Sequence, residues 1–187
     1  MTVNIDTRTI ESPAVSEIYI SATPGKNAPP AEMAEQIFSA ISDTLRSKKA
    51  RILQERVFAT EAVMETLSHA RSQAYHGHDL DDGVAPSFLV GDEGTVGPIA
   101  GVQVYALSGR AETQVINLDS TPCGRILRSP GHTFVTLSSV SAPGPAQATE
   151  QARACLEKAE CAAKVRNRFP FRRADLDLAQ GHTFLVR

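Results

Sequence analysis

The stretch from residue 17 to residue 59 constrains the fold most, because it reads as a strand, a loop, an amphipathic helix and a second strand. The apolar run Ile18–Ser21 stops at Thr23–Gly25, and prolines at 29 and 30 keep the following loop out of a β-ladder. We expect a helix over about residues 31–49 and a strand over 51–59. The helix must bury its apolar face, and the sheet formed by its flanking strands offers the nearest surface. The residues at helical spacing are Ala34, Ile37, Phe38, Ile41 and Leu45.

The chain up to residue 110 continues this alternation of helix and strand. Thr60 is a suitable N-cap for a second helix, which Gly77 can end in the left-handed conformation. Ser87–Val90 reads as a short strand, and Gly101–Leu107 alternates apolar with polar residues as a strand does. We expect residues 1–16 to form an irregular lead-in or an edge strand. Residues 1–110 are thus predicted to be an α+β unit, a ferredoxin-like sandwich with helices on one face of a mixed sheet.

The order and spacing of short motifs over roughly residues 14–108 resemble the Rid/YjgF family, the reactive-intermediate deaminases. The resemblance implies a chorismate-mutase-like sandwich, a trimer with ligand sites between subunits, and hydrolysis of an imine to a 2-oxo acid and ammonia. The motifs are a strand ending in Ser21, a helix carrying Glu35-Gln36, a strand ending in Phe58, Pro86-Ser87, and the strand Gly101–Leu107.

From Ala111 onward the pattern starts again but is not completed. We expect strands over 114–118, 124–128 and 133–137, then Ser138, a Pro/Gly-rich loop, Glu150-Gln151 and an amphipathic helix. This order repeats the one around Ser21, so residues 111–187 are interpreted as a partial second Rid-like repeat. Such a chain is similar to a truncated form of the tandem chorismatases. We expect both parts to share one continuous barrel-like core, and the last helix to need further cover.

Four residues are candidates for a ligand site through the resemblance. The family has an Arg after its Pro-x motif that grips the substrate carboxylate, and here Phe88 takes that place, next to Ser87. The family's Glu on the last strand, which positions or activates water, is replaced by Gln103. Glutamine can hold a water molecule but cannot take its proton. Gln103 is therefore the candidate catalytic position, and Tyr19, Ser87 and Phe88 are candidate substrate-binding residues.

Composition narrows the class of protein. A net charge of −2 argues against a general polyanion-binding protein, and no apolar run is long enough for a membrane span. Three cysteines cannot all pair within one chain, and the first residues lack the apolar core of a signal peptide, so we expect a cytoplasmic protein. No motif indicates a cofactor or a metal, and we expect neither.

Three further motifs have alternative interpretations. Cys123-Gly124-Arg125 could hold a reactive thiolate with His132 near it, but we favour a tight turn with Arg125 facing solvent. Residues 76–82 contain two His and three Asp, and we favour a solvated loop at a helix end over a metal site. The basic stretch 164–173 could bind RNA, and we favour a solvated helix end followed by a turn.

We therefore expect a Rid-like protein that binds a small carboxylate-bearing metabolite and has little imine or enamine hydrolase (deaminase) activity. If the chain is an enzyme, it is a hydrolase of the imine deaminase or chorismatase type. The alternatives are a chorismatase-like enzyme and an RNA-binding protein or ribonuclease of the same family. The acidic net charge disfavours nucleic acid as a partner, so the expected partners are a small-molecule ligand and further copies of the chain.

Overall fold

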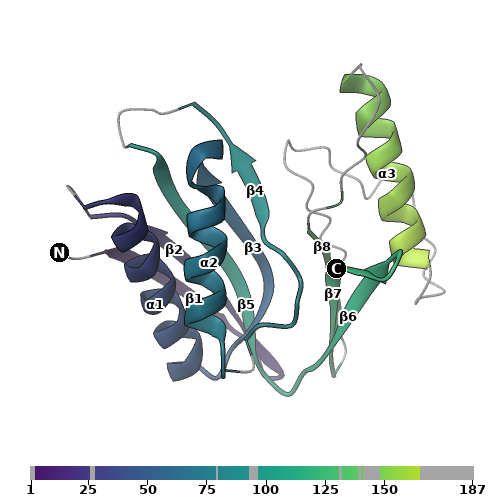
Figure 1. Ribbon diagram of the computed structural model, residues 1–187. Helices are drawn as coiled ribbons and strands as arrows, with labels where there is room; N and C mark the ends of the chain where they lie inside the picture. Colours follow the sequence, from purple (N-terminus) through teal and green to yellow (C-terminus); the bar gives the residue numbers. More distant parts are fainter. Residues whose placement is uncertain are drawn as a thin grey trace.

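The computed structural model describes residues 3–25, 28–78, 80–92, 97–130, 132–138, 140 and 148–164. Within these residues the chain is α+β, with two sheets and three α-helices. Figure 1 shows α1 (Pro30–Ser47) and α2 (Met64–Tyr75) beside one sheet, a second sheet beyond it, and α3 (Ala148–Lys164) on the outer side. The layers therefore follow the order helix, sheet, sheet, helix.

The first sheet has five strands in the order β1-β2-β5-β3-β4. Neighbouring strands are antiparallel except for β3 and β4, which run parallel. The strands expected from the sequence are confirmed, and the N-terminal residues form an edge strand rather than an irregular lead-in. The strand bounds are β1 Asn4–Glu11, β2 Val15–Thr23, β3 Arg51–Ala59, β4 Ser87–Val90 and β5 Ile99–Gly109.

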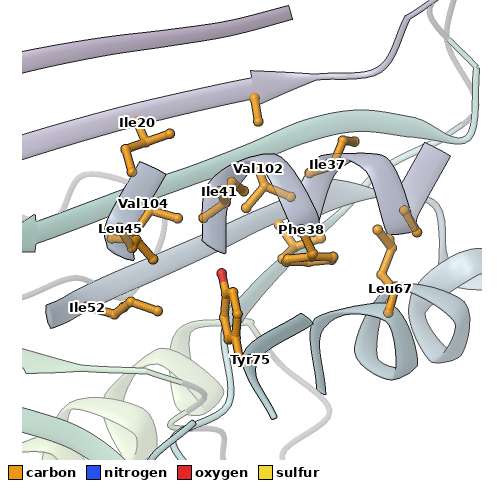
Figure 2. Packing of buried hydrophobic residues seen from close by; sticks show 14 of the residues in the cluster. Ile20, Ile37, Phe38, Ile41, Leu45, Ile52, Leu67, Tyr75, Val102 and Val104 are labelled. Atoms are coloured by element: carbon orange, nitrogen blue, oxygen red, sulfur yellow. The ribbon is translucent and has the colours of Figure 1, made fainter. Parts of the chain in front are cut away.

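Helices α1 and α2 cover one face of this sheet. The α1 side chains predicted from helical spacing, among them Ile37, Phe38 and Ile41, are buried against the strands (Figure 2). The sheet contributes even-numbered residues such as Ile20 of β2 and Val104 of β5. Full burial of an aliphatic or Phe side chain stabilises a fold by about 1.5–3 kcal/mol. The helices therefore fix one face of the sheet as core and leave the opposite face for other contacts.

A short 3-10 turn, Glu61–Val63, leads into α2. Thr60 occupies the N-cap position of this turn, as predicted, but its side chain makes no capping hydrogen bond. Gly77 follows the helix with a φ of 75°, as the sequence indicated. The buried residues of α2 are Leu67, Ala70, Arg71 and Tyr75. A charged and a phenolic side chain therefore lie on the buried face of this helix.

The second sheet has three antiparallel strands in the order β6-β7-β8, namely β6 Glu112–Leu118, β7 Thr121–Ser129 and β8 His132–Leu137. Helix α3 packs on one of its faces, where Ala159 and Ala162 join a cluster with Ile126 and Val135. Cys155 of α3 is also buried. The helix face that we expected to remain uncovered is therefore covered by the chain's own second sheet.

The opposite face of the second sheet packs against the first sheet. The junction is a small apolar cluster that joins strands β2, β3 and β5 to strands β7 and β8, and we call it the junction cluster. Each sheet also has its own larger cluster with its helices. The single continuous barrel-like core predicted from the sequence is therefore wrong, since two separate sheets pack face to face instead. The junction cluster consists of Val15, Leu53, Leu107, Leu127 and Phe134.

In the part of the chain that the structure describes, no helix combines the length and the apolar character needed to cross a membrane.

Candidate functional site

The face of the first sheet that points away from α1 and α2 carries two rows of side chains, each running across β2, β5 and β3. Cross-strand register places Tyr19 opposite Tyr105, and Tyr105 opposite Gln54. The second row is Ser21, Gln103 and Arg56, again with Gln103 in the middle. Side chains on a strand alternate between faces, so their even-numbered neighbours on β2 and β5 pack in the helix-side core.

These rows line an open hollow of about 350 Å³. A second hollow of about 230 Å³ continues along the same face and shares Ser21 and Gln103 with the first. We call the two together the sheet-face hollow. The centre of the sheet-face hollow lies over β5, and the neighbouring strands β2 and β3 form its walls. The first hollow is lined by Tyr19, Ile20, Ser21, Gln54, Arg56, Gln103, Val104 and Tyr105.

Two tyrosines and one carboxylate form a fixed group at one end of the hollow. The rings of Tyr19 and Tyr105 are stacked, with centroids 4.8 Å apart and an interplanar angle of 11°. Both hydroxyls donate to Oε2 of Glu17, each at 2.8 Å. Burial, together with the hydrogen bond to Glu17, raises the pKa of Tyr105 well above its usual range. Tyr105 therefore stays protonated near neutral pH and keeps donating to the carboxylate.

Arg56 and Gln103 supply the polar groups at the centre of the hollow. Arg56 carries the one positive charge among the described residues that line the first hollow, and it is half-buried. A guanidinium suits the bidentate recognition of a carboxylate. Gln103 is exposed and lies directly opposite Arg56 in register. Its amide can donate to a ligand or hold a water molecule, but it cannot act as a base.

Two of the four residues named from the family resemblance, Tyr19 and Gln103, line the same hollow. Ser87 lies opposite Arg56 on β4, and its hydroxyl is buried with no hydrogen-bond partner among the described residues. Phe88 is not brought to the hollow, because its side chain packs against the helix-side core. Parallel pairing of β4 with β3 sets Phe88 opposite the buried Val57 and so turns it to that side.

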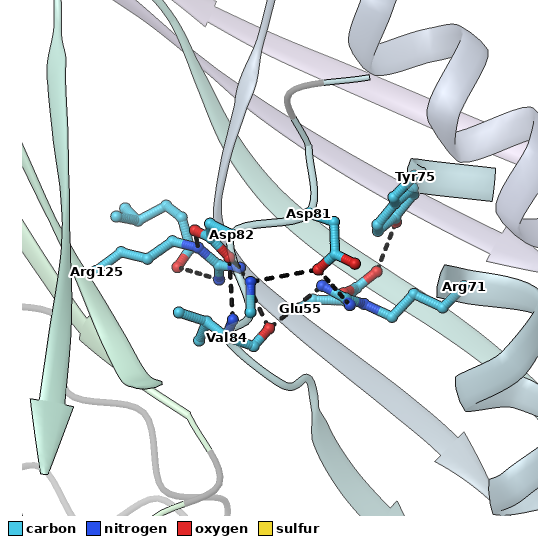
Figure 3. Close-up of polar contacts among 9 residues, drawn as sticks. Glu55, Arg71, Tyr75, Asp81, Asp82, Val84 and Arg125 are labelled. Carbon is cyan, nitrogen blue, oxygen red and sulfur yellow. Dashed lines mark hydrogen bonds and ion pairs between the residues drawn. The ribbon is translucent and has the colours of Figure 1, made fainter. Parts of the chain in front are cut away.

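A buried ion pair lies on the helix side of β3, and the sequence did not indicate it (Figure 3). Nε of Arg71 donates to Oε2 of Glu55 at 2.6 Å, and the hydroxyl of Tyr75 donates to Oε1 of Glu55 at 2.6 Å. Burial, with the Glu55 carboxylate, raises the pKa of Tyr75 well above its usual range. Burial alone would lower the pKa of Arg71, but its attraction to Glu55 raises it instead. Arg71 and Tyr75 therefore both stay protonated near neutral pH.

A second ion pair joins the second sheet to the loop between α2 and β4. Arg125 of β7 is 1% exposed, and it donates to both carboxylate oxygens of Asp82, from Nε at 2.5 Å and from Nη2 at 2.6 Å (Figure 3). The expected tight turn at Cys123-Gly124-Arg125, with Arg125 facing solvent, is therefore wrong, since all three residues lie within β7. In the sequence, Arg125 lies in the same strand as buried apolar residues, and this placement could have indicated a buried charge.

Cys123 has none of the features of an activated nucleophile. Burial raises the pKa of its thiol, which keeps the thiol protonated. The strand register places His132 opposite Ser129, at the other end of β7 from Cys123. At about 3.3 Å per residue, roughly 20 Å of strand separate the two. The register therefore disfavours the alternative in which His132 lies near a reactive Cys123.

The loop after α2 is bound by two arginines. Oδ1 of Asp81 lies 3.6 Å from Nη1 of Arg71, and Asp82 is bound by Arg125. The segment is a loop at the helix end with exposed residues such as His76 and Asp81, as expected, and the ion pairs to Arg71 and Arg125 were not expected. Among the described residues, no group of three or more His, Cys, Asp or Glu side chains could hold a metal ion. The basic stretch proposed as an RNA-binding alternative lies outside the described residues beyond Lys164.

Comparison with known proteins gives no relative from which a function could be transferred: no protein-family model matches the sequence, and no curated protein is significantly similar to it. The assignment of a function therefore depends on the geometry of the sheet-face hollow and on the resemblance in motif order.

Proposed function

We propose that this protein is a Rid-like binding protein for a small carboxylate-bearing metabolite, and that the sheet-face hollow is its ligand site. Arg56 binds the ligand carboxylate, Gln103 donates to a second polar group, and the exposed ring of Tyr19 provides an apolar wall. The observation that carries the proposal is the convergence of Tyr19 and Gln103, two positions named from the family pattern, on one hollow that also contains a guanidinium.

The arrangement of the first unit supports the Rid-like interpretation. Two helices on one face of a mixed sheet agree with a ferredoxin-like or chorismate-mutase-like sandwich. We interpret residues 111–187 as a partial second unit of the same kind, since β6 to β8 and α3 repeat a sheet covered by a helix on one face. A charged donor on a strand, as Arg56 is, is held more rigidly than one on a loop.

The binding proposal is tested by titrating the full chain with two probes, pyruvate and benzoate, followed by amide chemical shifts. We expect saturable shifts at Tyr19, Gln103 and their neighbours. Arg56→Gln should weaken binding by about tenfold or more, because a hydrogen bond to a charged group contributes about 1.5–3 kcal/mol. The matched control is Arg46→Gln on α1, whose guanidinium is exposed and lies 3.7 Å from Asp43. Equal affinities of Arg56→Gln and the unaltered chain would contradict the proposal.

The same site predicts that imine hydrolysis is absent or very slow. Gln103 cannot take a proton from water, and Phe88 packs in the core rather than offering a charge to the substrate. The measurement is release of ammonia or pyruvate from 2-iminopropionate generated in a coupled reaction. We expect Gln103→Glu to increase turnover by restoring a base. Turnover by the unaltered chain at the level of an active family member would show that the role given to position 103 is wrong.

A further inference from the structure

The junction between the two sheets is built on a β-bulge in β3. The register of β3 with β5 shifts between Ile52 and Gln54, so Leu53 has no partner residue on β5. Leu53 is fully buried and belongs to the junction cluster. Its carbonyl oxygen accepts a hydrogen bond from the hydroxyl of Thr136 on β8, and another at 3.5 Å from Nη1 of Arg125. The bulge therefore presents both a side chain and an acceptor to the second sheet.

The bulge also determines the lining of the sheet-face hollow. A bulge inserts one extra residue and re-aims the side chains that follow it. The residue after Leu53 is Gln54, which lines the hollow and lies opposite Tyr105. Leu53, which contacts the second sheet, and Gln54, which lines the sheet-face hollow, are thus neighbouring residues of β3.

Tyr105 connects the two regions directly. Its ring lines the hollow and stacks on Tyr19, and the same side chain packs against the junction cluster. Leu127 and Phe134 are the two residues that the second sheet adds to that cluster. Arg125 fixes the sheet itself, because it binds Asp82 and also donates to the carbonyl of Val84 at 3.4 Å.

We infer that the second sheet is a positioning element for the sheet-face hollow, and that Leu127 and Phe134 act on ligand binding through Tyr105. This inference rests on the proposed function for its effect on affinity. Neither residue lines the hollow, so they are positioning residues and not ligand contacts. The stacked pair of Tyr19 and Tyr105, with its shared bonds to Glu17, is the group whose geometry they maintain.

The test compares two neighbouring residues of β7 that point to opposite faces. Leu127 belongs to the junction cluster, whereas Ile126 belongs to the cluster beneath α3. Leu127→Val and Ile126→Val each remove one methylene group from a buried side chain, at adjacent positions of the same strand. We expect Leu127→Val to weaken pyruvate binding by about threefold to tenfold and Ile126→Val to leave it unchanged. Phe134→Leu, with Val135→Ala as its control, repeats the comparison on β8.

A ligand-free readout separates this inference from the proposed function. The chain has no tryptophan and only three tyrosines, so its near-ultraviolet circular dichroism reports chiefly on them. We expect Leu127→Val and Phe134→Leu to change this signal while the far-ultraviolet spectrum stays native, and the two controls to leave it unchanged. If pyruvate and benzoate do not bind at all, the dichroism still decides the positioning role. Equal spectra and affinities for Leu127→Val and the unaltered chain would overturn the inference.

Discussion

At the scale of single residues, the two least expected side chains are the buried arginines. Arg71 and Arg125 are both less than one-tenth exposed, and each binds a carboxylate. A buried charge is tolerated when it is paired and hydrogen-bonded, because pairing compensates its loss of hydration. Charge in a sequence usually indicates solvent exposure, and the sequence does not reveal where the compensating carboxylate lies. The partners here are 16 and 43 residues away along the chain.

Gly124 is predicted to be indispensable for pairing β7 with β8. A Cβ atom at this position would lie 2.2 Å from the carbonyl oxygen of Thr136 and 2.8 Å from a methyl of Leu137. Gly124→Ala should therefore lower the free energy of unfolding by about 3 kcal/mol, at the upper end of typical overpacking costs. Urea unfolding measures the loss. Gly91→Ala is the control, since its Cβ would meet nothing within 4 Å, and equal loss in both variants would contradict the steric explanation.

The tyrosines predict how stability changes at high pH. The pKa values of Tyr75 and Tyr105 are raised above the usual value of 10 in the folded chain, chiefly by burial. Folding therefore keeps protons that the unfolded chain releases, so their contribution is complete below pH 10 and is lost as the pH rises further. We expect a slope of about 1.4 kcal/mol per pH unit for each tyrosine. Urea midpoints measured from pH 8 upward should fall less steeply with pH for Tyr105→Phe than for the unaltered chain. Identical slopes for the two proteins would contradict this account.

At the scale of elements, helices and strands were predicted well because their periodicity is local. The α1 stripe from Ala34 to Leu45 and the alternation in β5 each follow from a few consecutive residues. The packing of α1 on the first sheet was predicted, but the contact between the two sheets was not, because a strand's own pattern does not show what covers it. Phe88 illustrates the limit for the site, since the parallel register with β3 turned it toward the core. The bulge at Leu53 likewise was not predicted from the sequence of β3.

The contact between β3 and α2 depends on one ion pair and one phenol. Arg71→Met would leave Glu55, which is 1% exposed, with only the hydroxyl of Tyr75. Removing one partner of a buried pair costs about 3–5 kcal/mol, because the remaining charge loses its compensation. We expect that loss in urea unfolding at pH 7. The double variant Glu55→Gln with Arg71→Met should recover part of it, and a double variant no more stable than the single would contradict the ionic explanation.

At the scale of the whole molecule, the face of the first sheet opposite its helices is only partly covered. The second sheet covers it around Leu53 and Leu107, which are completely or almost completely buried. Farther out on the same face, Tyr19 is 37% exposed and Ile10 is 57% exposed. We take this part of the face as the candidate contact surface for a second copy of the chain. The second sheet therefore covers part of this face within one chain, and we propose that a second copy of the chain covers the rest.

We predict that the chain self-associates as a trimer through this remaining face, with ligand sites near the contact, as the family resemblance implies. Light scattering coupled to size exclusion should give a mass near three times the 20.1 kDa of one chain at micromolar concentration. Ile10→Asp should shift the mass toward the monomer, because Ile10 lies opposite Glu17 on the same face as the tyrosines. Ile5→Asp is the matched control, since Ile5 lies on the same strand opposite Ala22 of the helix-side core. A well-folded monomer for the unaltered chain would mean that the second sheet completes the cover alone, and that the ligand site belongs to one chain.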